Sequence, residues 1–177
     1  MHPIIYDVAV SIDGFISGPS EDVSRFPHSG TIVDDYQARL QNYKTCLMGR
    51  KTYEFAYQFG LKPGQNPYPH MRSIVLSESI ELPKSSDVEL LSCVSKDAIG
   101  KIKRESDGDI YLCGGGELAN WMLANKLIDI LRIKRAPIIL GSGIKLFGEG
   151  DHFVDLTLVS STDYPNGALF QEFKLNY

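Results

Sequence analysis

The sequence predicts an α/β fold, in which a mostly parallel central sheet carries helices on both faces and antiparallel strands at its C-terminal end. The first observation is that short β-rich runs alternate with helical patterns from residue 4 to about residue 126. The second is that residues 128–177 hold three further strand candidates in succession. Because strands joined through helices pair in parallel and strands joined by turns pair antiparallel, the two regions predict the two parts of the sheet.

The chain begins with a predicted strand, residues 4–10, which leads into a turn marked by Asp13 and Gly14. A stretch rich in glycine, proline and serine follows. Residues 33–43 then repeat apolar side chains at spacings of three and four, as an amphipathic helix does; these side chains are Val33, Tyr36, Leu40 and Tyr43.

The next elements alternate again. A short apolar run at residues 45–48 predicts a strand, and residues 52–59 predict a helix that ends at Gly60, since glycine is the preferred residue after a helix. Several prolines make the following connection irregular. Two further β-rich runs, residues 73–77 and 88–94, predict strands.

Ser95 has the side chain of a helix N-cap and predicts a helix to about residue 106. A strand at residues 110–113 and a helix at residues 117–126 follow on either side of a triple glycine. The chain then ends in three predicted strands, at residues 128–136, 153–161 and 168–175.

Composition limits the classes of function. The chain has 177 residues, of which 43% are hydrophobic and 23% charged, and we expect residues 1–177 to form a single domain. A net charge of -4 disfavours binding to nucleic acid or to an anionic membrane, where a basic surface supplies much of the affinity. We find no signal peptide and no apolar run of transmembrane length. We therefore expect a cytoplasmic protein with a small-molecule partner.

The cysteines and histidines predict no metal site. Cys46, Cys93 and Cys113 lie in apolar runs without C-x-x-C spacing, so we expect buried thiols in a reducing compartment. The four histidines show no metal-ligand spacing, and we expect them at the surface; they are His2, His28, His70 and His152.

The triple glycine is the most informative motif. An apolar run, residues 110–113, stops at Gly114, Gly115 and Gly116, and a helix begins directly after them. Glycines let a ligand approach the backbone, and the helix N-terminus favours an anion such as phosphate. The alternative is a turn that only lets strand and helix pack closely. The motif matches neither the G-x-G-x-x-G fingerprint nor a P-loop.

A second strand-to-helix junction has similar chemistry. Gly49 is followed by Arg50, Lys51 and Thr52, which place two cations and a hydroxyl at the start of a predicted helix. This combination suits a pyrophosphate, although solvated basic residues at a helix start would look the same. Two such junctions in one small domain favour a dinucleotide, which has phosphates to engage both.

These motifs resemble those of the dihydrofolate reductase superfamily. Residues 49–52 are similar to its G-R-x-T element, residues 74–77 to the strand that follows, and residues 113–116 to its I-G-G-G turn. Residues 9–16 and 136–143 more closely resemble the C-terminal reductase domain of the bifunctional deaminase-reductase of riboflavin biosynthesis. The resemblance covers nearly the whole chain. It implies the dihydrofolate reductase-like fold and, by analogy with relatives of the riboflavin type, a homodimer.

The resemblance also implies a cofactor site for NADPH. Arg50 and Thr52 would bind its phosphates, and residues 114–118 would cradle its pyrophosphate. Glu78 stands where relatives often carry a basic residue for the 2′-phosphate, so NADH is an alternative. The implied cofactor-binding residues are Ala9, Ile16, Ser17, Gly49, Arg50, Lys51, Thr52, Ser77, Cys113, Gly114, Gly115, Gly116, Glu117 and Leu118.

Hydride transfer to a C=N bond places negative charge on nitrogen and calls for a proton donor. Asp34 is the first candidate, because the resemblance implies an acid at the start of the first long helix; capping the helix is its alternative role. Asp7, inside the apolar first strand, faces either a ligand or a structural partner. Asp13 is the third candidate, although an ordinary Asp-Gly turn explains it equally well.

We therefore predict a reductase that uses NADPH, or else NADH, to reduce a small nitrogen heterocycle. The leading prediction is similarity to 5-amino-6-(5-phosphoribosylamino)uracil reductase, for whose phosphate only Arg25 and Arg39 are obvious cations. A dihydrofolate reductase acting on a pterin is one alternative. A non-catalytic dinucleotide-binding module is the other.

Overall fold

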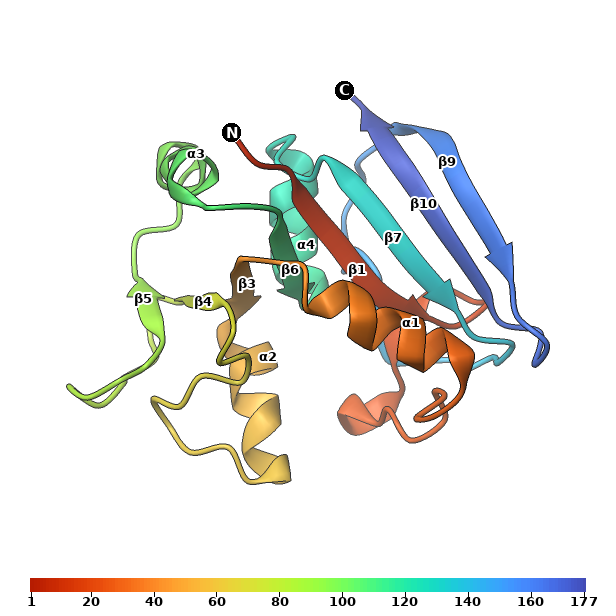
Figure 1. Cartoon of the computed structure of the whole chain (residues 1–177), viewed down its shortest axis with the longest axis horizontal. Coiled ribbons are helices and arrows are strands. Elements are labelled where there is room, and N and C mark those ends of the chain that lie inside the picture. Colours follow the sequence, from red (N-terminus) through yellow and green to blue (C-terminus); the bar gives the residue numbers. More distant parts are fainter.

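The computed structural model describes residues 1–177, which build one eight-stranded sheet (Figure 1). From one edge to the other its strands are β5 (Glu89–Leu91), β4 (Arg72–Leu76), β3 (Thr45–Gly49), β6 (Ile110–Gly114), β1 (Ile4–Val10), β7 (Ile130–Arg135), β10 (Leu169–Asn176) and β9 (Asp155–Asp163). The neighbours from β5 to β7 pair in parallel, whereas β10 runs antiparallel to both β7 and β9. This arrangement confirms the predicted fold class.

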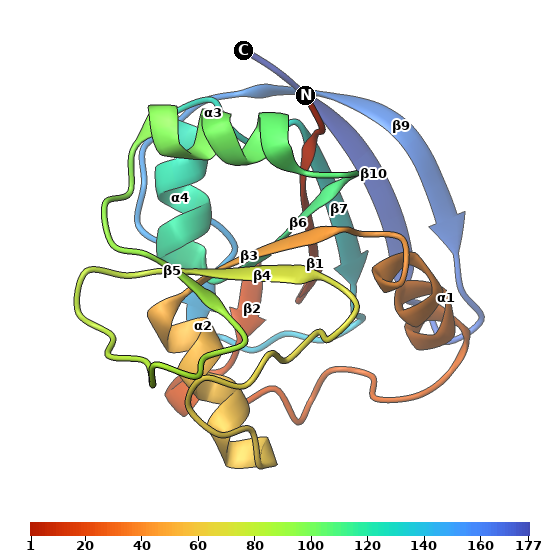
Figure 2. The same ribbon diagram turned by 60° about the vertical axis from the view of Figure 1, so that its left-hand side comes forward.

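Helices cover both faces of the sheet, as Figures 1 and 2 show. The four α-helices are α1 (Thr31–Leu40), α2 (Arg50–Phe55), α3 (Lys96–Glu105) and α4 (Gly116–Ala124). Helix α1 lies on one face, and α3 and α4 lie on the other. No helix combines the length and apolarity needed to cross a membrane.

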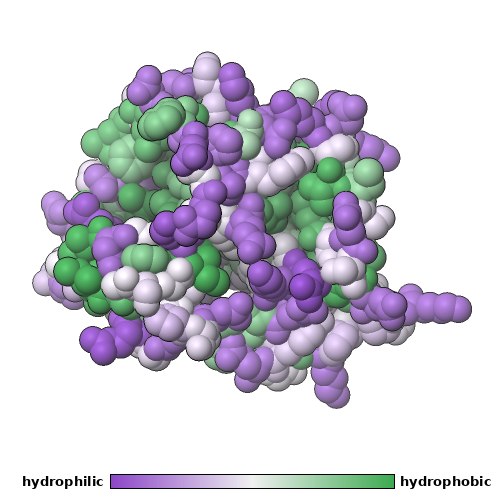
Figure 3. Space-filling view, turned by 180° about the vertical axis from the view of Figure 1, so that it is seen from behind, coloured by the Kyte–Doolittle hydropathy of each residue, from purple (hydrophilic) through white to green (hydrophobic).

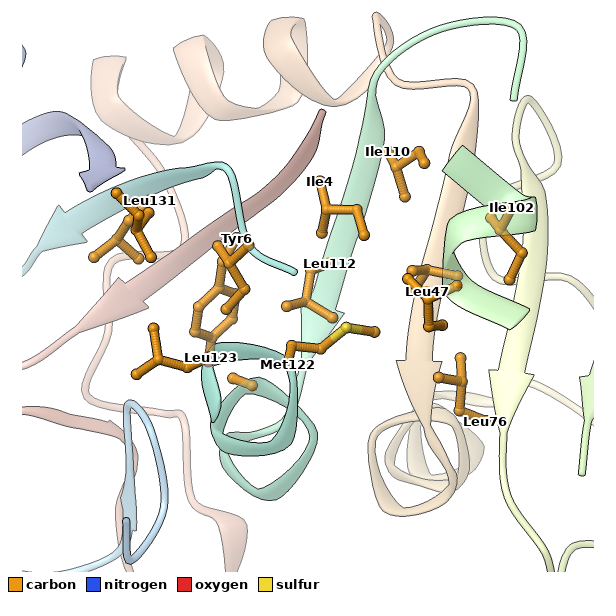
Figure 4. Packing of buried hydrophobic residues seen from close by; sticks show 14 of the residues in the cluster. Ile4, Tyr6, Leu47, Leu76, Ile102, Ile110, Leu112, Met122, Leu123 and Leu131 are labelled. Carbon is orange, nitrogen blue, oxygen red and sulfur yellow. The ribbon is translucent and has the colours of Figure 1, made fainter. Parts of the chain in front are cut away.

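Alternate side chains of the strands fill two separate cores. Ile4 and Tyr6 point to the side of α3 and α4 and join a cluster of 15 buried residues (Figure 4). Ile5, between them, points to the side of α1 and joins a second cluster of 10. The period-two alternation of a strand therefore supplies both layers from one sequence, which requires a nearly continuous apolar run.

The elements appear in the predicted order, and the differences lie at their ends. The first helix starts at Thr31 and ends at Leu40, earlier than predicted at both ends. The predicted helix 52–59 is α2 continued by a 3-10 turn, η2 (Ala56–Phe59), and it ends at Gly60 with φ of 92°. The strand predicted at 88–94 is limited to Glu89–Leu91, the residues that pair with β4. The predicted N-cap is confirmed, since the Ser95 hydroxyl accepts the Ala98 N–H.

A small second sheet was not predicted. It joins β2 (Phe15–Ser17), which a short 3-10 turn, η1 (Pro19–Glu21), follows, to β8 (Ile144–Lys145). Two and three residues are too few for an alternating pattern to be recognised. The contact is close, because a Cβ on Gly143 would overlap the Ser17 carbonyl oxygen and φ of Gly143 is 133°. The loop after β7 thereby reaches the loop after β1.

Candidate functional site

Two adjoining clefts open near the carboxyl ends of the parallel strands, the edge at which open α/β sheets bind ligands. The first, here called the large cleft, has a volume of about 730 Å³ and lies between α2, α4 and the loop with β2. The second, the small cleft, has a volume of about 330 Å³ and lies between α1 and the ends of β1 and β7. Val8 of β1 lines both clefts. Ligands in the two clefts could therefore meet at Val8.

The large cleft gathers most of the residues predicted for the cofactor. Both strand-to-helix junctions contribute, and so does the loop after β1. The predicted residues that line it are Ile16, Ser17, Gly49, Arg50, Lys51, Thr52, Cys113, Gly115, Gly116, Glu117 and Leu118. Residues from three distant segments thus meet around one cavity.

The triple glycine brings backbones close together at this cleft. Gly114 has φ of 104°, a value that side-chain-bearing residues rarely adopt, and a Cβ there would lie 3.5 Å from the Tyr6 ring. A Cβ on Gly115 would lie 3.3 Å from Oγ1 of Thr52, and one on Gly116 would overlap the Lys145 carbonyl oxygen. The turn therefore serves both of the functions that the sequence left open, close packing and backbone exposure to the cleft.

The cations at the second junction are held only loosely. Nη1 of Arg50 lies 3.2 Å from Oε2 of Glu54, and Nζ of Lys51 lies 3.1 Å from Oε1 of Glu117. All four side chains are at least one-third exposed, so solvent and salt screen both pairs and each stabilises the fold by roughly 0–1 kcal/mol. Arg50 and Lys51 can exchange these partners for an anionic ligand at little cost.

Ser17 offers the large cleft an unpaired polar group. Its side-chain oxygen is buried and has no hydrogen-bond partner in the protein. Buried polar groups are nearly always hydrogen-bonded, so an orphan hydroxyl in the lining of a cleft fits a site that a polar ligand completes. The wall beside it, which includes Trp121 and Ile144, supplies apolar surface for a flat ring.

Three residues predicted for the cofactor lie elsewhere. Ala9 lines the small cleft, because on β1 it faces the opposite side of the sheet from Val8. Gly114 does not line the large cleft, and a Cβ added to it would contact the Tyr6 ring. The Ser77 hydroxyl accepts hydrogen bonds from the N–H groups of Ser79 and Ile80, and so closes its own turn. Its exposed neighbour Glu78 lines the large cleft instead.

The small cleft is centred on a buried ion-pair network. Asp7 has a fully buried side chain, and its Oδ1 lies 2.7 Å from Nζ of Lys134. Its Oδ2 accepts from Nε of Arg39 at 3.2 Å and from the hydroxyl of Tyr43 at 3.1 Å. Tyr43 in turn accepts from Arg132 at 2.9 Å. Asp7 therefore has the structural partners that one interpretation predicts, and it also lines the small cleft.

Burial and charge set the protonation of this network. Burial alone would raise the pKa of Asp7, but the positive charges of Lys134 and Arg39 outweigh burial and lower that pKa. Burial lowers the pKa of Lys134, even though Asp7 opposes this effect. Asp7 is thus an ionised carboxylate at neutral pH, which excludes it as a proton donor there.

The other two predicted acids line neither cleft. Asp34 is exposed in the first turn of α1 and makes no capping hydrogen bond, so the geometry does not support it as the proton donor. Asp13 accepts hydrogen bonds from the Ser11 hydroxyl at 2.6 Å and from the Gly141 N–H at 2.7 Å. The Ser11 hydrogen bond is the main cause that lowers the pKa of Asp13 to about 2. Asp13 therefore fastens the loop at 140–141 as an ionised turn residue.

The prediction that all three cysteines are buried is wrong for Cys93, which is exposed beyond β5, where the predicted strand does not continue. Cys46 is buried, and Cys113 is half-buried at the end of β6. A hydrogen bond from the Cys46 thiol lowers the pKa of the Cys113 thiol to about 7. The structure contains no cluster of three His, Cys, Asp or Glu side chains placed to hold a metal ion.

Sequence reasoning missed the residue that dominates the small cleft, Lys134. In the sequence it is one of several basic residues in a strand with mixed polarity, where a solvated lysine is the ordinary expectation. The strand's position beside β1, which pairs Lys134 with Ala9, buries it. The pattern within residues 130–135 carries no signal of that neighbour.

A family model described as the RibD C-terminal domain matches residues 3–170. The chain belongs to this family. A curated relative, the uncharacterized protein YwjB of Bacillus subtilis (strain 168), is 30% identical over 145 residues, which are 80% of each chain.

Three solved structures have a similar fold. A Shewanella sp. PV-4 protein whose name links it to riboflavin biosynthesis matches with a TM-score of 0.82, 24% identity and complete coverage of both chains. The deaminase/5-amino-6-(5-phosphoribosylamino)uracil reductase of Thermotoga maritima matches with a TM-score of 0.71 and 18% identity, over 99% of this chain and 57% of that one. Dihydrofolate reductase of Enterococcus faecalis, complexed with NADP(H), matches with a TM-score of 0.70 and 16% identity, over 99% and 97%. These likenesses establish the dihydrofolate reductase-like fold.

Proposed function

We propose that the protein is a reductase that uses a reduced nicotinamide dinucleotide to reduce a C=N bond in a small nitrogen heterocycle. The observation that carries this proposal is the pair of clefts that adjoin at Val8, in a chain of the RibD C-terminal domain family. The large cleft has the volume and the glycine-lined backbone that a dinucleotide requires. The small cleft has the size of a single ring system.

In the large cleft, Arg50, Thr52 and the N-terminus of α4 would hold the phosphates of the dinucleotide. The Ser17 hydroxyl and the wall at Trp121 would contact a heterocycle. When bound, the dinucleotide supplies a hydride. We propose NADPH as this dinucleotide, by likeness to the reductase of Enterococcus faecalis, and NADH as the alternative, because Glu78 would repel a 2′-phosphate placed beside it.

The charges of the small cleft favour a substrate without a phosphate group. The Thermotoga maritima relative is named for a phosphoribosylamino compound, whose phosphate would need unpaired cations nearby. Neither Arg25 nor Arg39 lines the small cleft, and Lys134, the cation that does line it, is paired with Asp7. We therefore propose an unphosphorylated ring, such as a pterin or an aminouracil, in preference to the phosphoribosylamino compound.

Fluorescence of the single tryptophan tests the cofactor part of the proposal. Trp121 lines the large cleft, so NADPH or NADH should quench its emission and raise the melting temperature. Arg50→Ala should weaken binding by roughly tenfold to a hundredfold, because a hydrogen bond to a charged group contributes about 1.5–3 kcal/mol. Arg104→Ala, an exposed change on α3, is the matched control. If neither dinucleotide binds the wild-type protein, the proposal fails.

A substrate screen tests the reductase part. Pterins and aminouracils, with and without ribose phosphate, are added with each dinucleotide, and the loss of absorbance at the dihydronicotinamide band is followed. Oxidation with an unphosphorylated ring supports the proposal. Binding of the dinucleotide without oxidation by any ring would favour the non-catalytic module.

We also propose that two copies associate through β9. This strand is the last of the sheet, all nine of its residues are exposed, and its outer edge has no partner. Leu156, Leu158 and Val159 are each about half exposed there. Figure 3 shows apolar surface gathered in patches on one face of the molecule. Exposed edges and apolar patches of this kind mark association sites. Light scattering should give a dimer that Leu158→Lys dissociates and Phe59→Lys, at another exposed apolar residue, does not.

A further inference from the structure

The small cleft contains a buried cation with spare hydrogen-bond donors. Lys134 lies opposite Ala9 in the β1–β7 register, is only 9% exposed and lines the cleft. An ammonium group has three donors. One N–H of Lys134 donates to Asp7, and Nζ lies 3.5 Å from the centroid of the Tyr36 ring. No other acceptor contacts Nζ within the protein, so a donor remains for a group in the cleft.

The network around Asp7 carries a net positive charge beside the cleft. Lys134 and Arg39 both pair with Asp7, which leaves two positive charges against one negative charge. In a buried site such an excess stabilises negative charge that develops on a bound molecule more strongly than it would in water. The network therefore suits a substrate atom that becomes more basic during reaction.

No carboxylic acid is placed to give a proton in this cleft. Asp34 is exposed outside it, Asp13 is bound to its own loop, and Asp7 is ionised. The remaining titratable groups of the cleft are His28 and Tyr36. Tyr36 shares a hydrogen bond with Tyr111 at 2.9 Å, and burial raises its pKa. His28 is exposed in the loop before α1.

We propose that Lys134 is the catalytic acid of the small cleft, and that the substrate is a flat, unphosphorylated heterocycle whose C=N nitrogen accepts the Lys134 N–H. This inference rests on the proposed function. The dinucleotide supplies a hydride to the carbon of the C=N bond, and the π electron pair moves to nitrogen. That nitrogen then takes a proton from Nζ of Lys134, whose N–H bond breaks and leaves a neutral amine. Water that enters the open cleft returns the proton.

The surroundings of Lys134 suit this exchange. Burial lowers the pKa of Lys134, which eases loss of the proton. The groups that face it are Asp7 on β1, Arg39 and Tyr36 on α1, and Cys113 at the end of β6. Asp7 holds the ammonium in place through one oxygen, while Arg39 and Tyr43 fix the other oxygen. The proton donor is thus oriented by one oxygen of a carboxylate whose other oxygen is fixed by two hydrogen bonds.

Two variants of Lys134 separate proton donation from charge. Lys134→Met removes both the proton donor and the charge. Binding is measured by calorimetry with pterin or 5-aminouracil as the probe, and we expect either probe to bind this variant roughly tenfold more weakly. Lys134→Arg keeps the charge and the partner of Asp7, but an arginine does not give up its proton. We expect this variant to bind the probe and to lose turnover by roughly 10²–10⁴-fold. His28→Gln tests the competing acid, and Lys84→Met is the control for an exposed lysine.

The outcomes distinguish this inference from the proposed function. Lys134 does not line the large cleft, so quenching of Trp121 by the dinucleotide should be unchanged in both variants. If wild-type protein binds neither dinucleotide, the proposed function fails. If wild-type protein oxidises the dinucleotide and Lys134→Arg does so within about twofold, only the inference fails. The inference also fails if neither probe binds wild-type protein, or if His28→Gln alone abolishes turnover.

Discussion

The large cleft and the small cleft draw their residues from the chain in different ways. The large cleft takes nine of its 20 lining residues from two short segments, 49–52 and 113–118, which hold the two strand-to-helix junctions. The small cleft depends on side chains that are far apart in the sequence. The hydrogen bond from Lys134 to Asp7 spans 127 residues.

This difference explains what each cleft reveals in the sequence. A strand, a glycine turn and a helix start form one local unit, so residue types alone mark the place where a backbone is open to a ligand. A buried ion pair is formed by strand register, which no local pattern encodes. The comparison implies that loss of a single charge destabilises the fold little at the large cleft and strongly at the small cleft.

The largest expected effect is at Asp7. Asp7→Asn leaves Lys134 and Arg39 buried without their counter-charge, and breaking a buried pair in this way destabilises a fold by about 3–5 kcal/mol. Urea unfolding monitored by circular dichroism measures the change. Asp107→Asn, an exposed aspartate in the loop after α3, should stay within about 0.5 kcal/mol.

The same experiment can break the comparison. A loss below about 1 kcal/mol for Asp7→Asn would mean that water reaches the network, and that the small cleft is no drier than the large one. The double variant Asp7→Asn/Lys134→Met refines the result. If the pair is coupled, the double variant should be less destabilised than the sum of the two single changes.

The sequence was sufficient for most of the fold because the alternation of apolar runs and helical spacing persists along the chain. It was insufficient where an element is too short for a period, as at Phe15–Ser17 and Ile144–Lys145. Of the proposed acids, Asp34 had a plausible position along the chain, but the helix turns its side chain to solvent. No local sequence pattern indicated that Lys134 is buried, because its burial depends on contacts with β1 and α1.

An intermediate effect is expected at Ser17, which sharpens the account of the large cleft. Its hydroxyl and that of Ser73 are both buried and unpaired, but only Ser17 lines the cleft. Ser17→Ala should weaken dinucleotide binding by roughly threefold to tenfold, the effect of one neutral hydrogen bond of about 0.5–1.5 kcal/mol. Ser73→Ala is the matched control. Equal quenching curves for both variants would remove Ser17 from the ligand site.

The smallest effect is expected at Asp13, which lines neither cleft. Its carboxylate binds the Leu140 and Gly141 N–H groups and so holds the loop before β8 against the turn before β2. The folded pKa of Asp13 is about 2, below the value of about 3.9 in an unfolded chain. A lowered carboxyl pKa stabilises the fold above the unfolded value, and that contribution is lost as pH falls from about 4 to about 2. Wild-type protein should therefore exceed Asp13→Asn in stability at pH 5, and the difference should shrink toward pH 2.

Because the carboxylate is exposed, this pH-dependent difference should stay well below the loss at Asp7. Unfolding curves at several pH values measure it, and a difference that stays constant from pH 5 to pH 2 would show that Asp13 holds the loop without its charge.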